Sequence, residues 1–247
     1  MNVDDHGWLV GAEGEPAVTR WPTVRTYALA TREPLAVVWH TTDERGGPGT
    51  SEAMARRIQT FRIGVDRPAS WHLLIAKDGA MYQSAPFTVG TWHVGVGGVI
   101  AGRRFPNINH VTVGIEFENA GRLKRLGALA YCWPYVVNPT ARPTERRLDP
   151  ACALPLERAV ATPLGLFDAF TAAQEDSAGL VVQALVARYG WTREVCAYGH
   201  AEFDPAHRED PGPIWQQTVL PRVLDRIFGV VGPIASTAGT AGQGTSL

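Results

Sequence analysis

The sequence predicts a mixed α/β fold in a single domain, with a central mixed β-sheet flanked by helices. Two stretches, LAVVWHTT (35–42) and HVTVGIEFEN (110–119), have the apolar and β-branched composition of strands. A third, SWHLLIAKDGAMYQSA (70–85), carries an Asp-Gly pair between two apolar runs. Residues 51–64 and 166–190 have helical periodicity instead. Strands and helices therefore follow one another along the chain, as in a sheet that is covered by helices.

The composition is that of a globular protein with many loops. At 247 residues, with 45% hydrophobic and 19% charged residues, the chain is long enough to bury one sizeable core. A formal net charge of −1 argues against a nucleic-acid partner, for which a strong basic excess is typical. The sequence has no apolar stretch long enough to span a bilayer, and its first residues do not resemble a secretory signal. We expect a monomer that is made in the cytoplasm without a signal peptide.

The three cysteines, Cys132, Cys152 and Cys196, are too few and too scattered for a disulfide framework or a Cys-x-x-Cys zinc site. We interpret them as free thiols. Cys196 is expected to be buried.

The first predicted strand, 35–42, places His40 near its carboxyl end, where functional sites are often built. The helix predicted after it begins near Ser51, which can cap it, and ends at Gly64. Its apolar side chains recur at helical spacing, at Met54, Ile58 and Phe61.

A hairpin and a half-buried strand are predicted next. Asp78-Gly79 is a strong short-range signal for two antiparallel strands joined by a turn. In the 110–119 stretch, apolar residues alternate with Thr112, Gly114, Glu116 and Glu118, which is the period of a strand with one apolar face. The two glutamates are therefore expected to share the other face.

The second half of the chain is less regular. Residues 122–156 have no clear pattern, and we interpret them as an insertion or long excursion. Residues 166–190 predict a helix that ends at Gly190 and buries a stripe formed by Leu180, Ala184, Leu185 and Ala187. A short helix is predicted at 221–229, and the small-residue tail at 229–247 is expected to be disordered.

The stretch CAYGHAEFDPAHREDPGP (196–213) gathers His200, His207 and Asp210 in a run rich in Pro and Gly. A hydrolytic zinc site needs three protein ligands and an open fourth position, and His40, His200 and Asp210 together supply such a set. A surface turn rich in polar residues is the alternative. The types of ligand alone do not decide between the two.

Five motifs carry a family resemblance, in the order VVWHTT, SWHLLIAKDGAMYQ, TWHVG, VGIEFENAG and YGHAEFDPAHREDPGP. This series resembles the zinc-dependent N-acetylmuramoyl-L-alanine amidases of type 2, which are related to peptidoglycan recognition proteins and phage lysozyme-amidases. The match runs from Pro34 to Ile214 and is interrupted by residues 122–156. The resemblance implies an amidase fold with a zinc catalytic domain at 34–228 and an N-terminal extension, 1–33, packed on it.

The resemblance also implies roles for five residues. The zinc ligands fall on His40, His200 and Asp210, and the catalytic glutamate falls on Glu116. Arg208 stands where many members have lysine and would stabilise the oxyanion. Two alternatives remain open here: Glu118 as the base in place of Glu116, and a surface pairing of Arg208 with Glu209 or Asp204.

Several further residues are candidates for substrate binding. Trp92 and His93, in TWHVG, match a family segment that lines the substrate cleft. His72 is expected either to approach the site or to pack in the core. His207 is either an alternative ligand or an exposed loop residue. The basic residues of 122–156 would either attract the carboxylates of stem peptides or belong to a solvated loop.

The implied activity is zinc-dependent hydrolysis of the amide between N-acetylmuramic acid and L-alanine in peptidoglycan. A phage-type endolysin that acts on the cell wall is favoured. The alternatives are a cytosolic recycling amidase for anhydromuropeptides, an effector delivered by a secretion machine, and a non-catalytic recognition module. A structural zinc domain would instead need a fourth protein ligand, either His207 or Cys196.

Overall fold

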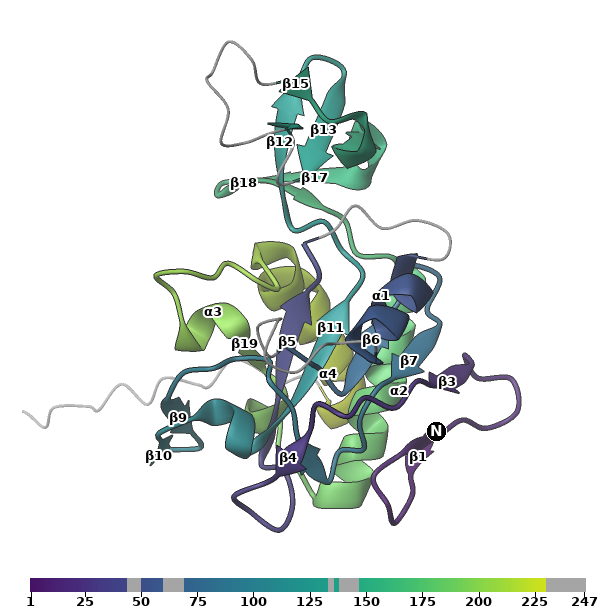
Figure 1. Ribbon diagram of the computed structural model, residues 1–247, viewed down its shortest axis with the longest axis vertical. Helices are drawn as coiled ribbons and strands as arrows, with labels where there is room; N and C mark the ends of the chain where they lie inside the picture. Colours follow the sequence, from purple (N-terminus) through teal and green to yellow (C-terminus); the bar gives the residue numbers. More distant parts are fainter. Residues whose placement is uncertain (44–49, 60–68, 133–135, 138–146, 230–247) are drawn as a thin grey trace, which may run out of the picture.

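The computed structural model describes residues 1–43, 50–59, 69–132, 136–137 and 147–229. Six strands form its central sheet: β3 Val18–Arg20, β5 Ala36–Thr41, β6 Leu73–Ile75, β7 Met81–Gln83, β11 Thr112–Phe117 and β19 Tyr198–Gly199. Their order in the sheet is β19-β5-β11-β6-β7-β3 (Figure 1). Neighbouring strands from β19 to β6 are parallel, whereas β6 and β7 are antiparallel. The predicted mixed α/β fold with a central mixed sheet is therefore confirmed.

Helices cover both faces of this sheet (Figure 1). The long ones are α1 Thr50–Gln59, α2 Ala172–Tyr189 and α4 Leu220–Phe228. On one face, Trp39 and Ile115 join residues of α2 and α4 in the main core. On the other face, α1 packs on β6 and β7, where Met54 meets Leu74. Glu116 on β11 is in register with Leu74, so the Glu116 side chain lies on the α1 side of the sheet.

The first 33 residues add short strands to this domain. They are β1 Asn2–Val3, β2 Leu9–Val10, β3 and β4 Tyr27–Ala28. Strand β3 extends the central sheet beside β7, and β4 pairs with β8, which spans Val89–Gly90. Val3 and Leu9 are buried in the main core. These residues thus pack on the same core as the central sheet.

Several predicted elements are confirmed. His40 is the second-last residue of β5, and the short terminal helix is α4, which follows a π-helical turn at Trp215–Val219. The hairpin β6–β7 turns at Asp78-Gly79, as predicted. Gly79 has a φ of +86°, a region that favours glycine, and the Asp78 carboxylate accepts a hydrogen bond from the backbone N of Ala80 at 3.0 Å.

The long predicted helix begins later than the sequence indicated. Residues 166–168 belong to a strand, and α2 begins at Ala172. Its start is set by Thr171, whose hydroxyl accepts a hydrogen bond from the backbone N of Gln174 at 3.1 Å. Gly190 ends the helix with a φ of +67°, as predicted.

The predicted buried stripe of this helix was wrong in part. Ala184 and Leu185 are buried, but Ala187 is exposed and Leu180 only half-buried. The buried face also carries polar side chains, which an apolar pattern does not reveal. It is formed by Gln174, Ser177, Ala178, Val181, Val182, Ala184 and Leu185.

The helix predicted after β5 is confirmed as α1, but Ser51 does not cap it. Ser51 lies in the first turn, and its hydroxyl donates a hydrogen bond to the Glu118 carboxylate. The side chain of Ile58 and residues 60–68, with the predicted end at Gly64, lie outside the described part of the chain. The predicted tail, 230–247, does so as well.

The segment interpreted as an irregular excursion, 122–156, forms a second sheet together with residues 159–168. Its five antiparallel strands are β12 Arg122–Leu126, β13 Leu129–Cys132, β16 Ala153–Pro155, β17 Ala159–Thr162 and β18 Gly165–Asp168, in the order β16-β13-β12-β18-β17. The expectation of irregular structure was wrong, because strands of three to five residues are too short to leave a clear period in the sequence. This inserted sheet has a small core of its own and stands at one end of the molecule (Figure 1).

The shorter elements complete the described chain. They are β14 Val136–Val137, which pairs with β15 Arg147–Leu148, the hairpin of β9 Gly98–Ile100 and β10 Arg103–Phe105, the one-turn helix α3 His200–Phe203, and 3₁₀ turns at Ile108–His110, Pro150–Cys152, Leu156–Arg158 and Glu194–Cys196. All three cysteines are free thiols, as predicted, and all three are buried, whereas burial was expected only for Cys196.

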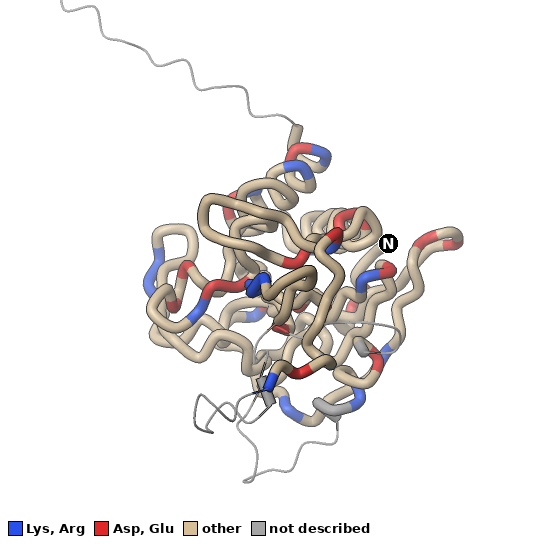
Figure 2. Tube along the Cα trace, turned by 90° about the horizontal axis from the view of Figure 1, so that it is seen from above, with Lys and Arg blue, Asp and Glu red and all other residues tan. Residues whose placement is uncertain are grey.

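Acidic and basic residues are interspersed along the described chain (Figure 2). Many pair on the surface, for example Arg226 with Asp176 and Arg193 with Asp225. Exposed pairs of this kind contribute little to stability. None of the described helices has both the length and the apolar character needed to cross a membrane.

Asp168 joins the inserted sheet to the central domain. Its carboxylate, which is almost fully buried, accepts a hydrogen bond from the backbone N of Ala120 at 2.9 Å. It also lies 3.0 Å from Lys77 Nζ and 2.9 Å from Arg158 Nη2. One carboxylate therefore holds the end of β18, the β6–β7 turn and the residue before β17 together.

Asp168→Ala is expected to lower the free energy of unfolding by about 3 kcal/mol, because a buried carboxylate shared by two cations and a backbone donor is lost. Urea denaturation of the purified variant measures this change. Asp176→Ala is the matched control, since Asp176 is exposed and pairs with Arg226 on the surface. Equal effects of the two substitutions would show that Asp168 does not anchor the inserted sheet.

Candidate metal centre and active site

Three candidate ligands meet at the carboxyl ends of adjacent parallel strands. His40 lies at the end of β5, and His200 follows directly after β19, the neighbour of β5. Asp210 lies in the loop after α3. Residues 160 positions apart in the sequence are thereby brought into contact. All three side chains are buried.

The geometry of this cluster suits a tetrahedral metal ion. His40 Nδ1 lies 3.0 Å from His200 Nδ1 and 3.1 Å from Asp210 Oδ2, and His200 Nδ1 lies 3.2 Å from the same oxygen. Ligands bound tetrahedrally to zinc at 2.0–2.2 Å are roughly 3.3 Å or a little more apart. Three donor atoms converge on one point at nearly this spacing. The residues present therefore fit a zinc ion.

The protonation states also fit a metal site. Burial lowers the pKa of His40, which favours the neutral imidazole with a free lone pair. Burial by itself would raise the pKa of Asp210, but hydrogen bonds with His200 and His40 outweigh it and lower that pKa, so the carboxylate is ionised. A neutral imidazole and an ionised carboxylate are the forms that bind metal ions.

A fourth protein ligand is not found among the described residues around this cluster. His207 is exposed, and its Nδ1 lies 2.8 Å from Asp204 Oδ1 on the surface. Cys196 is buried in the main core, where burial raises the pKa of its thiol to about 12. Neither residue is therefore part of the cluster of His40, His200 and Asp210.

Glu116 lies beside the cluster of His40, His200 and Asp210, which is called the metal cluster below. It is in register with His40 on the neighbouring strand, and both residues line the same hollow. Its Oε2 atom is buried and has no hydrogen-bond partner within the described chain. Burial, followed by the charges of Asp210 and Asp43, raises the pKa of Glu116 well above its usual range. A carboxylate with a raised pKa next to a metal site is suited to accept and return a proton.

Glu118 is not placed for this role. Strand β11 ends at Phe117, and Glu118 lines a different pocket together with Lys77. There its carboxylate accepts hydrogen bonds from the Ser51 hydroxyl and, at 3.2 Å, from the backbone N of Lys77. Both glutamates lie on the α1 side of the sheet, but they line different pockets, because the strand ends between them.

Arg208 is exposed and lines the hollow with Glu116 and Asp210. The two surface acids considered as its partners bind other residues. Glu209 pairs with Arg122, and Asp204 pairs with His207. Arg208 thus lines the same hollow as the cluster, and its role in catalysis stays a prediction.

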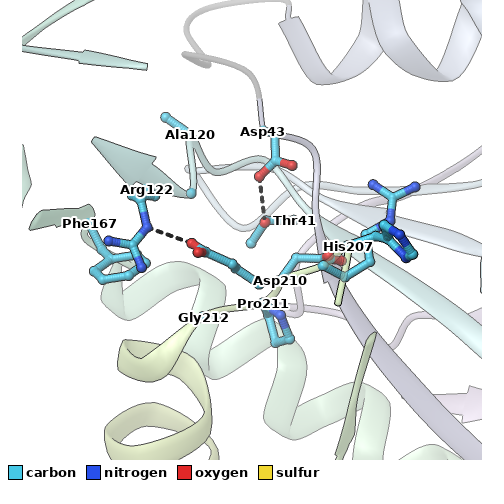
Figure 3. A pocket seen from close by; sticks show the side chains of 12 residues that line it. Thr41, Asp43, Ala120, Arg122, Phe167, His207, Asp210, Pro211 and Gly212 are labelled. Atoms are coloured by element: carbon cyan, nitrogen blue, oxygen red, sulfur yellow. Dashed lines mark hydrogen bonds and ion pairs between the residues drawn. The ribbon is translucent and has the colours of Figure 1, made fainter. Parts of the chain in front are cut away.

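Two hollows meet at the metal cluster. The first, of about 410 Å³, is lined by the cluster, Glu116 and a group of aromatic and amide side chains: Trp71, Trp92, Asn107 and Asn109. The second, of about 200 Å³, lies between the ligand loop 207–212 and Arg122 and Phe167 of the inserted sheet (Figure 3). In Figure 3, Asp43 points toward Thr41. Arg122 Nε donates a hydrogen bond to the Glu209 carboxylate. Thr41, Arg208 and Asp210 line both hollows.

The other predicted substrate-binding residues have different positions. Trp92 is 38% exposed and lines the first hollow, where it can cover a ligand. His93 also borders this hollow but is buried, and its two ring nitrogens lie within 3.3 Å of His40 Nε2 and Thr112 Oγ1. His93 thus lies against His40 of the cluster and also borders the first hollow, so its expected role in substrate binding stays a prediction.

His72 does not reach the site. It is fully buried, and burial lowers the pKa of its imidazole to about 4. Its Nε2 donates to the backbone O of Val89, and its Nδ1 accepts from the backbone N of Gly114. Of the two roles considered for His72, packing in the core is the one observed.

Asn109 is a functional residue that sequence reasoning missed. Its side-chain Oδ1 accepts hydrogen bonds from the backbone N of His93 at 3.2 Å, Val94 at 2.6 Å and Gly95 at 3.3 Å. It thus holds the segment that carries Trp92 and His93. A polar residue in a 3₁₀ turn has no periodicity, so the sequence contained no signal for this role.

The fold and the site together define an α/β domain with a buried cluster of three residues that could hold a metal ion. A family model described as N-acetylmuramoyl-L-alanine amidase matches residues 30–213, so the chain belongs to this family. Its enzymatic activity is therefore that of a peptidoglycan amidase, and the resemblance noted in the sequence is confirmed.

Solved structures are similar to this chain in fold. A selenomethionine derivative of AmpD has 23% identity and a TM-score of 0.52, with 90% of this chain and 99% of that chain covered. AmiD from E. coli, in complex with anhydro-N-acetylmuramic acid-L-Ala-D-gamma-Glu-L-Lys, has 19% identity and a TM-score of 0.49. The match covers 90% of this chain and 65% of that chain. A mutant endolysin from Bacillus subtilis has 16% identity and a TM-score of 0.48, with 86% of this chain and 99% of that chain covered. No curated protein sequence matches the chain.

Proposed function

We propose that this amidase is zinc-dependent, with His40, His200 and Asp210 as the zinc ligands and Glu116 as the catalytic base. The observation that carries the proposal is the convergence of three donor atoms within 3.2 Å of one another, beside the buried and unpartnered Glu116 Oε2. The bond cleaved is the amide between the lactyl group of N-acetylmuramic acid and L-alanine.

A zinc ion in this cluster would lower the pKa of water to about 7 and polarise the scissile carbonyl. Glu116 takes the proton of the attacking water and returns it to the nitrogen of the L-alanine that leaves. Arg208 directs its guanidinium toward the carbonyl oxygen, where negative charge develops during the attack. Trp92 covers one side of the substrate in the first hollow.

We further propose that the substrate is the intact cell wall, as for a phage-type endolysin that is made in the cytoplasm and then reaches the wall. The support for this is the extension of the site on both sides of the metal cluster. The wall has a glycan strand on one side of the reacting bond and a stem peptide on the other, and an anhydromuropeptide differs from it in having a much shorter sugar part. A recycling amidase would instead prefer small anhydromuropeptides.

The test is a digest of purified peptidoglycan by the zinc-loaded protein, with mass spectrometry of new free L-alanine amino termini. We expect these termini to form, and to disappear when zinc is removed with a chelator. A parallel digest of an anhydromuropeptide compares the two substrates. Faster release from the anhydromuropeptide would favour the recycling role. Binding to the wall without release would indicate a recognition module.

Arg208→Ala is expected to lower kcat about 100-fold, the usual cost of removing one donor to a developing oxyanion, with little change in KM. Arg208→Lys is expected to retain most of the activity, since the family often has lysine at this position. Arg222→Ala is the control, because Arg222 pairs with Glu175 on the surface. An unchanged kcat in Arg208→Ala would exclude a role for Arg208 in the reaction.

A further inference from the structure

A chain of buried hydrogen bonds connects the backbone of Ile108 to the metal ligand His40. The Thr112 hydroxyl donates to the Ile108 carbonyl oxygen at 2.8 Å, and Thr112 Oγ1 lies 3.3 Å from His93 Nε2. His93 Nδ1 in turn lies 3.1 Å from His40 Nε2. Thr112, His93 and His40 are all buried, so solvent does not compete for these contacts.

The Ile108 carbonyl, at the start of this series of hydrogen bonds, determines the direction of every bond in the series. A carbonyl oxygen only accepts, so the single hydroxyl hydrogen of Thr112 is committed to Ile108. Thr112 Oγ1 must then accept from the N–H at His93 Nε2. A neutral imidazole has one N–H, so His93 Nδ1 accepts from the N–H at His40 Nε2. His40 Nδ1 is left with a lone pair, and it is this atom that lies beside His200 Nδ1 and Asp210 Oδ2.

We propose that Thr112 is a positioning residue of the metal centre, which acts through His93 to set the tautomer and ring orientation of His40. The inference rests on the metal site of the proposed function and goes beyond it, because Thr112 contacts neither the ligand cluster nor the substrate. Outer hydrogen bonds of this kind fix a metal-binding imidazole in place and raise metal affinity.

Two features hold His93 in the position that this series of hydrogen bonds requires. Asn109 accepts hydrogen bonds from the backbone N–H groups of residues 93–95, which fixes the backbone from which the His93 side chain extends. Gly114 leaves space for the ring, since a Cβ atom at residue 114 would lie 2.5 Å from His93 Cγ. His200 differs from His40, because its Nε2 is buried without a hydrogen-bond partner among the residues described. Of the two histidines in the cluster, it is therefore His40 whose second ring nitrogen is hydrogen-bonded within the described residues.

The first test is zinc affinity, measured by competition with a chelator. Thr112→Val keeps the shape of the side chain but removes the hydroxyl, and the Ile108 carbonyl keeps its bond from the backbone N of Val111. We expect the dissociation constant for zinc to rise about 10- to 100-fold in this variant. Thr112→Ser retains the hydroxyl and is expected to remain within a few-fold of the wild type.

Thr91→Val is the matched control. Thr91 is equally buried, and its hydroxyl lies 3.0 Å from a ring nitrogen of His72, which does not contact the ligands. We expect its zinc affinity to be unchanged. Equal loss in Thr91→Val and Thr112→Val, or unchanged affinity in a folded Thr112→Val, would overturn the proposal.

The second test reads the tautomers directly, in zinc-free protein labelled with ¹⁵N-histidine, by NMR. In the wild type we expect the proton of His93 on Nε2 and that of His40 on Nε2. In Thr112→Val we expect this single tautomer of His93 to be lost. A wild-type His93 with its proton on Nδ1 would overturn the proposal. Failure of the wild type to bind zinc would refute the zinc part of the proposed function, while the tautomers would still decide the role of Thr112.

Discussion

Asp210→Ala is expected to remove zinc from the protein and to reduce amidase activity below detection. Asp210 Oδ2 is the one negatively charged donor of the cluster and contacts both histidines. Loss of an outer partner typically costs 10- to 100-fold in metal affinity, so we expect the loss of a direct ligand to exceed about 100-fold. Zinc content by elemental analysis and amidase turnover measure the two effects.

Two further variants make this test specific. Asp204→Ala changes an acid in the same loop that binds His207 rather than the cluster, and should retain zinc and activity. Asp210→Cys supplies a thiolate, another ligand that zinc accepts, and should recover part of the zinc binding. Full zinc content in Asp210→Ala would show that the metal is bound elsewhere.

Glu116→Gln is expected to lower kcat by about 100- to 10,000-fold while zinc stays bound, because glutamine has the shape of glutamate but cannot accept the proton of water. Turnover and zinc content of the same sample provide the measurement. Glu52→Gln, a change of a glutamate on α1, is the control. A variant with normal kcat would refute Glu116 as the base.

The same substitution also has an expected effect on stability. Burial raises the pKa of Glu116, so the folded protein holds this proton more tightly than the unfolded chain does. Its favourable contribution is present below the ordinary glutamate pKa of about 4.3 and is lost as the pH rises through the raised value. Zinc-free Glu116→Gln should therefore be more stable than zinc-free wild type at pH 7, with little difference at pH 4, in urea denaturation. Equal stability at pH 7 would contradict the raised pKa.

Local patterns in the sequence determined several elements of this protein. The β-branched run that ends near His40 predicted β5, because a buried parallel strand needs an uninterrupted apolar segment. The Asp-Gly pair at residues 78–79 predicted the β6–β7 hairpin, because few other residues adopt a positive φ. The motifs around His40, Glu116, His200 and Asp210 placed the chain in its family, as the family model confirms.

The tertiary structure alone decided how these residues work together. A period of two placed Glu116 and Glu118 on the same face, but the end of β11 at Phe117 leads them into different pockets. His72 and His93 are both histidines after a tryptophan, yet one packs in the core and the other supports His40. The inserted sheet had no readable period, because its strands are too short. Contacts between residues distant in sequence depend on where each strand ends and which neighbour it meets, and that information is not contained in local periodicity.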